Sequence, residues 1–222
     1  GTMIAKSENS KGGNIEVTGD IIEIENGSLL DASGGNEGGK ILVGGSWQNS
    51  DPKVYQAKNV TVEENAEINA NSIKYGKGGE IVVWSDIHNK SGKTSVSGIL
   101  NAKGGIRGGD GGRIETSGHK LDINNANVST KSFYGKDGEW LLDPYNIEIS
   151  SSGSSDYTAN EDDEVISAST LVSALASSNI TVRTDGGGSQ DGDIRVSSAI
   201  SSSSSNDLTL DADNDIIINA NI

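Results

Sequence analysis

Residues 100–118 read Leu-Asn-Ala-Lys-Gly-Gly-Ile-Arg-Gly-Gly-Asp-Gly-Gly-Arg-Ile-Glu-Thr-Ser-Gly. The stretch joins the end of one short strand, through glycine-rich corners, to the start of the next strand. Its Gly-Gly-x-Ile unit occurs four times, at Gly12–Ile15, Gly38–Ile41, Gly78–Ile81 and Gly111–Ile114, with a degenerate copy at Gly138–Trp140. Strands that alternate with sharp glycine corners are typical of a solenoid, because each corner must bend beside an equivalent corner of the next coil.

Aliphatic residues alternate with polar residues along most of the chain. Ile15 and Val17, Ile41 and Val43, and many later pairs are separated by one residue. This spacing places each pair on one side of a short strand, with the residue between them facing out. Together with the glycine corners it predicts an all-β parallel β-helix. One short helix is expected near 168–177, because Leu171, Ala174 and Leu175 have helical spacing.

We expect one continuous solenoid in three stretches. Coils occupy residues 1–149 and resume over 180–222, and residues 150–179 hold a Ser-rich and acidic excursion followed by the helix. With coils about 4.8 Å apart, roughly six to nine coils would form a rod of roughly 30–45 Å. An antiparallel sandwich is the main alternative fold. Sandwiches usually carry aromatic core residues and hairpin dipeptides, whereas this sequence has one Phe and an isolated Asn26-Gly27.

The composition is acidic and poor in aromatic residues. The 222 residues include 17 Lys and Arg and 32 Asp and Glu, a net charge of −15, and only 4% are aromatic. Such a chain is repelled by nucleic acids and anionic membranes. Low hydrophobicity with high charge is also a mark of disorder, but the regular aliphatic spacing predicts a narrow ordered core. There is no cysteine, and no stretch approaches the roughly 18 apolar residues of a membrane span.

Several motifs extend this interpretation to a family. They are Leu30–Gly35, Gly38–Gly45, Val82–Asp86, Ile114–His119 and, as the most specific, Gly138–Ile147 with its Trp-Leu-Leu-Asp-Pro run. This set resembles the exoproteins of bacterial two-partner secretion, the filamentous-haemagglutinin-like and high-molecular-weight adhesins. The resemblance implies a right-handed parallel β-helix, export through an outer-membrane transporter, and adherence to host cells or other bacteria. The Asn-Pro-Asn-Gly motifs of the family's secretion domain are missing, so we expect a segment downstream of that domain.

The expected function is that of a structural and binding rod segment of a large adhesin, and not of an enzyme. We expect it to be secreted or held at the surface of a Gram-negative bacterium. The expected partners are a surface receptor on host cells or bacteria, with glycans as one candidate class, and the transporter during export. No cofactor, nucleic acid or membrane insertion is expected. Trp47, Trp84 and Tyr55 are the candidate exposed aromatics for stacking on sugars.

Five Asn-x-Ser/Thr sequons are candidates for N-glycosylation. They begin at Asn26, Asn59, Asn89, Asn127 and Asn179. This is about the number that chance gives for such a composition. Asn89, in a predicted loop, is the best acceptor among them.

Candidate catalytic and metal-binding groups are sparse. Asp86 and His88 share a predicted strand face with Trp84, which brings a carboxylate near an imidazole but equally describes a polar surface cluster. His119 is expected in a turn. The acids at Asp211, Asp213 and Asp215 lack the central Gly and the final acid of a calcium loop. Asp110 with Arg113 is the other pair considered for catalysis. We expect no catalytic and no metal site; the alternative function is a polysaccharide-binding or polysaccharide-cleaving β-helix domain.

Overall fold

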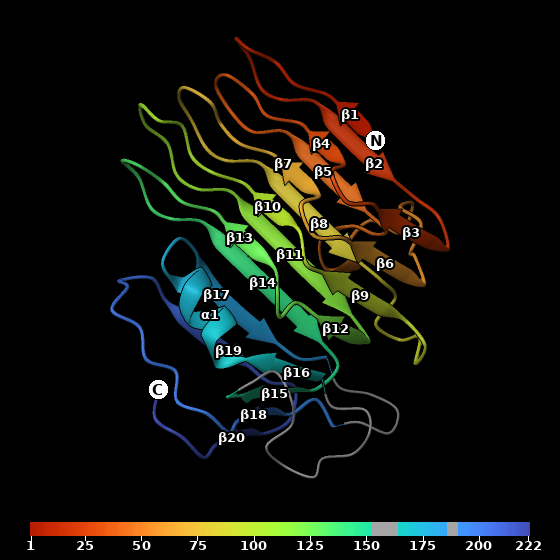
Figure 1. Ribbon diagram of the computed structural model, residues 1–222, viewed down its shortest axis with the longest axis vertical. Coiled ribbons are helices and arrows are strands. Elements are labelled where there is room, and N and C mark those ends of the chain that lie inside the picture. The colour runs from red at the N-terminus through yellow and green to blue at the C-terminus, as the bar shows by residue number, and fades with distance from the viewer. Residues whose placement is uncertain (152–163, 186–190) are drawn as a thin grey trace.

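The computed structural model describes residues 1–151, 164–185 and 191–222. It is a parallel β-helix, in which successive coils add strands to stacked sheets (Figure 1). Every strand pair in the described part of the chain is parallel. The predicted all-β parallel β-helix is therefore confirmed, and the antiparallel sandwich is wrong.

The strands of the described residues form four sheets. The first contains, in spatial order, β1 (Thr2–Ile4), β4 (Leu29–Asp31), β7 (Glu67–Asn69), β10 (Ile99–Asn101) and β13 (Asn127–Ser129). The second, the longest, contains β2 (Asn14–Val17), β5 (Lys40–Val43), β8 (Glu80–Trp84), β11 (Arg113–Gly118), β14 (Glu139–Pro144), β17 (Asn179–Arg183) and β19 (Leu208–Asp211). The third contains β3 (Ile21–Ile24), β6 (Asn59–Val62), β9 (Lys93–Val96) and β12 (Lys120–Asp122). The fourth contains β16 (Glu164–Ser167), β15 (Ile147–Ser150), β18 (Ile194–Val196) and β20 (Ile216–Ile218).

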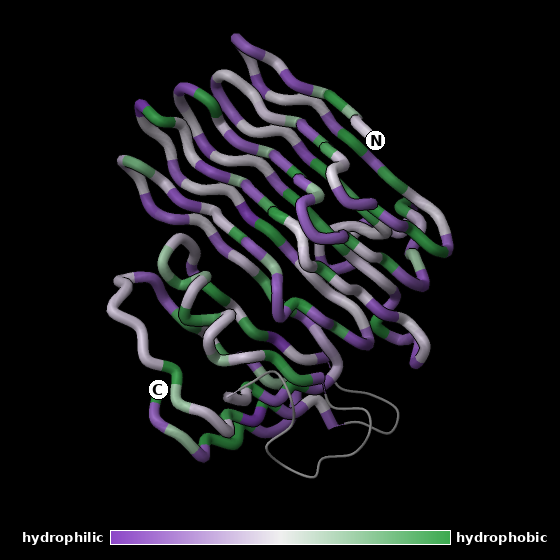
Figure 2. The backbone as a smooth tube through the Cα atoms, in the orientation of Figure 1, coloured by the Kyte–Doolittle hydropathy of each residue, from purple (hydrophilic) through white to green (hydrophobic). Residues whose placement is uncertain are grey.

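The core consists of columns of aliphatic side chains that run along the rod. In-register pairing in the second sheet stacks Ile15, Ile41, Ile81, Ile114, Trp140, Ile180 and Leu208 in one inward column. Figure 2 shows the corresponding alternation of hydrophobic and hydrophilic residues along the strands. One polar residue, Thr116, occupies the neighbouring inward column and is fully buried. Its hydroxyl oxygen accepts a hydrogen bond from Trp140 Nε1 at 3.1 Å, so the buried polar group has a partner.

The Gly-Gly corners stack too closely to hold a side chain. A Cβ on Gly111 would lie 1.7 Å from the carbonyl oxygen of Thr130, and a Cβ on Gly138 would lie 1.9 Å from that of Gly112. Glycine is therefore required by contacts between successive coils, which explains the repeated motif. Gly138 confirms that the degenerate copy is a true corner.

The strand order departs from the chain order near the helix. β16 follows β15 in sequence, yet it lies between β12 and β15 in space (Figure 1). This strand lies within the excursion expected over 150–179 and was not predicted from the sequence. Residues 152–163 of the excursion lie outside the described part of the chain. Directly after β16, helix α1 (Ala168–Leu175) takes a first-sheet position beside β13. The helix predicted near 168–177 is confirmed.

Candidate functional site

Residues 44–57 leave the second sheet after β5 and cover part of its outer surface; we call them the lid. The backbone N–H of Ala57 donates to the carbonyl oxygen of Gly44 at 2.8 Å, which closes the loop at its base. Val54 of the lid packs with Leu42, Val82, Trp84 and Ile87 in a small apolar cluster outside the main core, and Trp47 of the lid is packed against this cluster. The outward-facing Leu42 and Val82 are apolar because the lid shields them from water.

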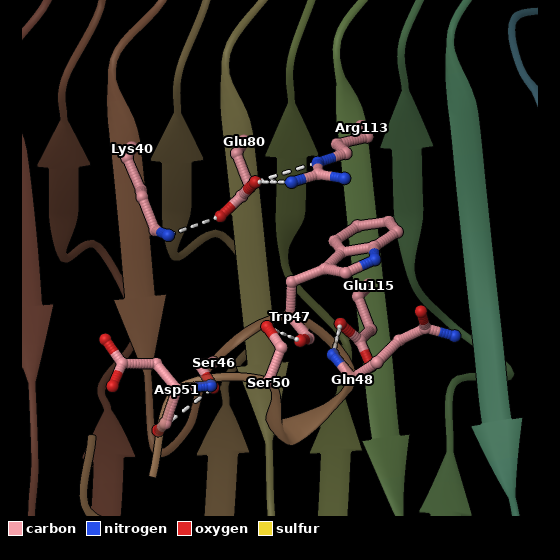
Figure 3. Close-up of polar contacts among 9 residues, drawn as sticks. All are labelled: Lys40, Ser46, Trp47, Gln48, Ser50, Asp51, Glu80, Arg113 and Glu115. Atoms are coloured by element: carbon pink, nitrogen blue, oxygen red, sulfur yellow. Dashed lines mark hydrogen bonds and ion pairs between the residues drawn. The ribbon is translucent and has the colours of Figure 1, made fainter. Parts of the chain in front are cut away.

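An ion-pair ladder lies beside the lid on three adjacent strands (Figure 3). Glu80 pairs with Lys40 Nζ at 2.9 Å on one side and accepts from Arg113 Nε at 2.7 Å on the other. Partial burial opposes ionisation of Glu80, but hydrogen bonds from Lys40 and Arg113 outweigh it and lower the pKa of Glu80. The Arg113 guanidinium lies 4.2 Å from the centre of the Trp47 ring, so the ladder holds the lid in place.

Glu115 is a buried acid beneath the lid. It lies on the outward face of β11 with no exposed surface. The backbone N–H of Gln48 donates to its Oε2 at 2.8 Å (Figure 3). Ser117 Oγ donates to its Oε1 at 2.9 Å. Gln48 makes this contact with a positive φ of 46°, which is uncommon for a residue with a side chain. Burial raises the pKa of Glu115 to about 8, so the carboxyl is largely protonated at neutral pH.

A polar cleft of about 480 Å³ lies next to the lid, at the carboxyl ends of the second-sheet strands. Its floor includes Asp143, which is 5% exposed and whose Oδ1 has no hydrogen-bond partner in the described part of the chain. Burial raises the pKa of Asp143 to about 7; neighbouring Asp185 adds to the rise, and Arg183 opposes it. The other lining residues are Gln48, Asn49, Trp84, Ile87, His88, Arg183, Thr184, Asp185, Asp211, Ala212 and Asp213.

Metal-binding geometry does not occur in residues 1–151, 164–185 and 191–222: no three His, Cys, Asp or Glu side chains are arranged to hold an ion. The acids of the 211–215 stretch have separate surroundings. Asp211 Oδ2 accepts from Arg183 Nε at 2.9 Å, whereas the backbone N–H of Asp215 donates to Asp193 Oδ1 at 3.1 Å. Among the described residues there is also no helix that is long and apolar enough to cross a membrane.

A second distinctive surface is made by the loops that precede β8, β11 and β14. These loops protrude in a row along one edge of the solenoid (Figure 1), and we call residues 71–78, 103–111 and 131–138 the loop edge. They contain six of the 17 basic residues of the chain, Lys74, Lys77, Lys103, Arg107, Lys131 and Lys136, against two acids, Asp110 and Asp137. They also contain four exposed large apolar residues, Tyr75, Ile106, Phe133 and Tyr134.

Hydrogen bonds between successive loops hold the loop edge in shape. The backbone N–H of Arg107 donates to the carbonyl oxygen of Lys74 at 2.8 Å, and that of Gly104 donates to Lys131 at 2.9 Å. The Arg107 guanidinium also lies 5.7 Å from the centre of the Tyr75 ring and donates to its hydroxyl at 3.2 Å. The exposed side chains are thus presented at the spacing of the coils.

The three aromatic residues expected to face a sugar have different environments. Trp84 is 1% exposed and its Nε1 donates to Gln56 Oε1 at 3.4 Å, so the expectation that it is exposed is wrong. Trp47 is half-buried and stacks against Arg113. Tyr55 is exposed, and its hydroxyl donates to Asp20. The loop-edge aromatics were missed; the available signal was an apolar residue between successive glycine corners.

The sequon asparagines differ in how many hydrogen bonds their side-chain amides already make within the protein. Asn179 Nδ2 donates to Asp137 O at 2.8 Å and its Oδ1 accepts from Asp207 N at 3.0 Å, which leaves a poor acceptor for a glycan. Oδ1 of Asn59, in β6, accepts from Lys93 N at 3.0 Å. Asn89 Oδ1 accepts from Ser91 N at 3.1 Å in a turn. The two remaining sequons, at Asn26 and Asn127, have exposed side chains.

The histidine candidates are not arranged for acid–base catalysis. β8 ends at Trp84, and Asp86 Oδ1 accepts from the backbone N–H of His88 at 3.0 Å, so this pair forms a turn and does not share a strand face as expected. His119 lies in the bend between β11 and β12, as expected, but it is buried. Its Nδ1 lies 2.9 Å from Ile87 O.

The other pair considered for catalysis is separated by its contacts. Arg113 pairs with Glu80, whereas Asp110 Oδ1 accepts from the backbone N–H of Lys136 at 2.9 Å. The structure therefore does not join Asp110 and Arg113 in one site.

No protein-family model matches this chain, and no curated protein matches it.

Proposed function

We propose that this protein is a rod segment of a large, secreted bacterial surface adhesin, and that the loop edge is its receptor-binding surface. The stacked coils support the rod, because each coil adds length while repeating the same outer faces. The sequence motifs that resemble two-partner secretion exoproteins support the adhesin, its export through an outer-membrane transporter and its location at the surface of a Gram-negative bacterium.

The observation that carries the binding role is the charge of the loop edge. The loop edge contains six basic residues and two acids, whereas the whole chain has a net charge of −15. The two acids are also committed to the loops themselves, since Asp110 accepts from Lys136 N and Asp137 accepts from Ser132 N. Lys74 Nζ also donates to two uncharged groups, Glu8 O at 3.0 Å and Asn9 Oδ1 at 3.2 Å. The positive charge of the loop edge is therefore not neutralised within it and can attract an anionic partner.

The receptor chemistry that fits this surface is a glycan that bears carboxylate or sulfate groups. Lys and Arg pair with such anions, and Arg does so in a two-pronged geometry. The exposed rings of Tyr75, Phe133 and Tyr134 offer apolar surfaces and, through the tyrosine hydroxyls, a hydrogen-bonding group. Because successive loops are hydrogen-bonded to one another, little ordering is required when an extended glycan binds along the edge.

The pair of buried acids Glu115 and Asp143 does not support the alternative of a polysaccharide-cleaving domain. Glycoside hydrolysis needs two carboxyl groups that flank one bond of the substrate. Asp143 lines the cleft, whereas Glu115 is covered by the lid and is not part of the cleft lining. These two acids therefore do not face a common substrate space.

Binding of the purified protein to a glycan array and to cultured epithelial cells tests the proposal. We expect retention of sulfated or carboxylated glycans, weakening as salt rises, because exposed charges are screened. The triple variant Lys74→Gln, Arg107→Gln, Lys131→Gln is expected to weaken binding about tenfold or more, in line with the loss of charge-assisted contacts.

A matched triple variant is the control. Lys58→Gln, Lys93→Gln, Lys120→Gln removes the same charge at the third sheet and is expected to leave binding unchanged. Phe133→Ser with Tyr134→Ser tests the aromatic contribution, and both rings are exposed enough for the fold to tolerate the change. Equal losses in the two triple variants, or no binding to any glycan or cell, would contradict a receptor site at the loop edge.

A further inference from the structure

The cleft beside the lid has an excess of negative charge with an unsatisfied acid at its floor. Asp143, Asp185, Asp211 and Asp213 contribute four carboxyl groups, and Arg183 contributes the one guanidinium among the lining residues. Arg183 is already paired with Asp211 at 2.9 Å. This group of acids differs from a set of ordinary surface charges, because one of its members, Asp143, is more than nine-tenths buried.

Asp143 is the group that points to a ligand. Buried polar atoms in folded proteins nearly always have a hydrogen-bond partner, because desolvation without one is costly. Asp143 Oδ1 has no such partner in the described part of the chain, although the residue lines a cleft wide enough for a small molecule. A donor that enters the cleft therefore lies beside a carboxyl group whose burial is not offset by a hydrogen bond to Oδ1.

We propose that the cleft binds a primary ammonium group, with Asp143 as its anchor. An ammonium group supplies three N–H donors and a positive charge, which matches several carboxylates around one space. A calcium ion would need six to eight oxygen ligands, and no set of three acids in the described ranges has metal-binding geometry. The ligand chemistry is therefore that of an organic cation.

The other lining residues of the cleft suit a polar molecule that bears this ammonium group; we call this molecule the carrier. Gln48 and Asn49 from the lid, Thr184 and His88 all line the cleft, and each can bond to hydroxyl or amide groups. Two carriers share the required chemistry, an amino sugar and a lysine side chain. This site lies at the carboxyl ends of the second-sheet strands, whereas the loop edge precedes their amino ends, so the two proposals concern separate surfaces.

Calorimetric titration of the full chain with D-glucosamine and with Nα-acetyl-lysine amide tests the proposal. N-acetyl-D-glucosamine and the Nε-acetylated lysine are the neutral controls. We expect at least one amine to bind and its acetylated form to bind about tenfold or more weakly, because acetylation removes the charge. The stronger amine identifies the carrier. Calcium chloride is the third arm, and no binding is expected there.

Two cleft variants and one matched control locate the site. Asp143→Asn and Asp185→Asn are each expected to reduce amine affinity about tenfold, whereas Asp122→Asn, which removes the same charge from exposed Asp122 on β12, leaves affinity unchanged. Since either cleft variant can test the site, a folding defect in one does not end the experiment.

Binding of Nα-acetyl-lysine amide, whose ε-amine stays charged throughout this range, is also expected to weaken as pH falls from 8 to 6. Asp143, whose pKa burial raises to about 7, takes up a proton in this range and loses its charge. The other charged and titratable groups of the cleft are Asp185, Asp211, Asp213, Arg183 and His88, and Glu115 lies on the neighbouring strand. Absence of amine binding, an unchanged affinity in both cleft variants, or calcium binding in place of the amine would overturn the proposal.

Discussion

At the scale of single residues, the outer face of the second sheet carries acids in two different environments, one exposed to solvent and one buried. Glu16 on β2 and Glu115 on β11 belong to the same outward column, with Leu42 on β5 and Val82 on β8 between them. Glu16 is exposed, whereas Glu115 is sealed by the lid. The difference in their environments comes from the lid and not from the strands that carry them.

Glu115→Gln is expected to change how stability depends on pH. The folded-state pKa of about 8 exceeds the ordinary value of 4.5, so the folded protein holds this proton more tightly than the unfolded chain does. The contribution to stability is fully present below about pH 4.5 and is lost as pH rises to about 8. The variant is neutral throughout, so we expect it to exceed the wild type by roughly 2–4 kcal/mol at pH 9 and to equal it near pH 4.

Denaturant unfolding of both proteins across this pH range measures the effect. Glu16→Gln is the control, because it makes the same chemical change at an exposed position of the same column. Parallel stability curves for Glu115→Gln and the wild type would contradict the proposed protonation of Glu115.

At the scale of elements, the side chains of Asn124 and Glu164 bridge the third and fourth sheets, and the Glu164 carboxylate accepts from the backbone N–H of Leu121 in β12. Asn124 follows β12 and bridges to β16, donating from Nδ2 to Val165 O at 3.2 Å and accepting at Oδ1 from Ser167 N at 2.8 Å. Its carbonyl oxygen also accepts from Thr170 Oγ1 at 3.0 Å, which adds helix α1 to the junction. An amide side chain here takes the place of strand-to-strand backbone bonds.

Asn124→Ala is expected to loosen β16 and the start of α1. The loss of two side-chain bonds should lower local stability by about 1–3 kcal/mol, since the partner groups on β16 are left unpaired. Hydrogen exchange over residues 164–175 is expected to accelerate, while exchange in β14 stays the same. Asn125→Ala, at the exposed neighbouring position, is the control. Equal exchange in the two variants would argue against this role of Asn124.

At the scale of the whole molecule, the displaced order of β15 and β16 interrupts a simple coil-by-coil assembly. β15 pairs with β16 and β18, both of which come later in the chain. The earlier coils end at β12 in the third sheet and at β14 in the second. A chain that folds from its amino end can therefore stack coils through β14, but β15 has no sheet partner until β16 has been inserted.

Two truncated chains test this order. In residues 1–150, the amides of β15 are expected to exchange rapidly, because both partner strands are missing. In residues 1–178, β16 and α1 are present, so we expect protection of β15. The amides of β14 serve as the internal control, since pairing with β11 is available in both chains. Equal protection of β15 in the two chains would show that its order does not depend on β16.

Much of the fold could be predicted from local signals. Alternation at Ile81 and Val83 predicts a strand, the close contacts at Gly111 explain why glycine repeats at the corners, and the spacing of Leu171 and Leu175 predicts the helix. The proposed functional surfaces were harder to predict from such local signals. The polar residues that follow Trp84 in the sequence are typical of an exposed strand end. A lid that begins forty residues earlier in the chain nevertheless buries Trp84.

The sequence by itself determined the parallel β-helix, its glycine corners and its short helix, because strand periodicity, the steric demands of stacked corners and helical spacing are properties of neighbouring residues. Only the tertiary structure decided where β16 inserts, which acids the lid buries and which loops line up as a basic, aromatic edge. Those features depend on packing between segments that are distant in the chain. The burial of Asp143 and Glu115 and the row formed by Tyr75, Ile106 and Tyr134 therefore exist only once the coils are stacked.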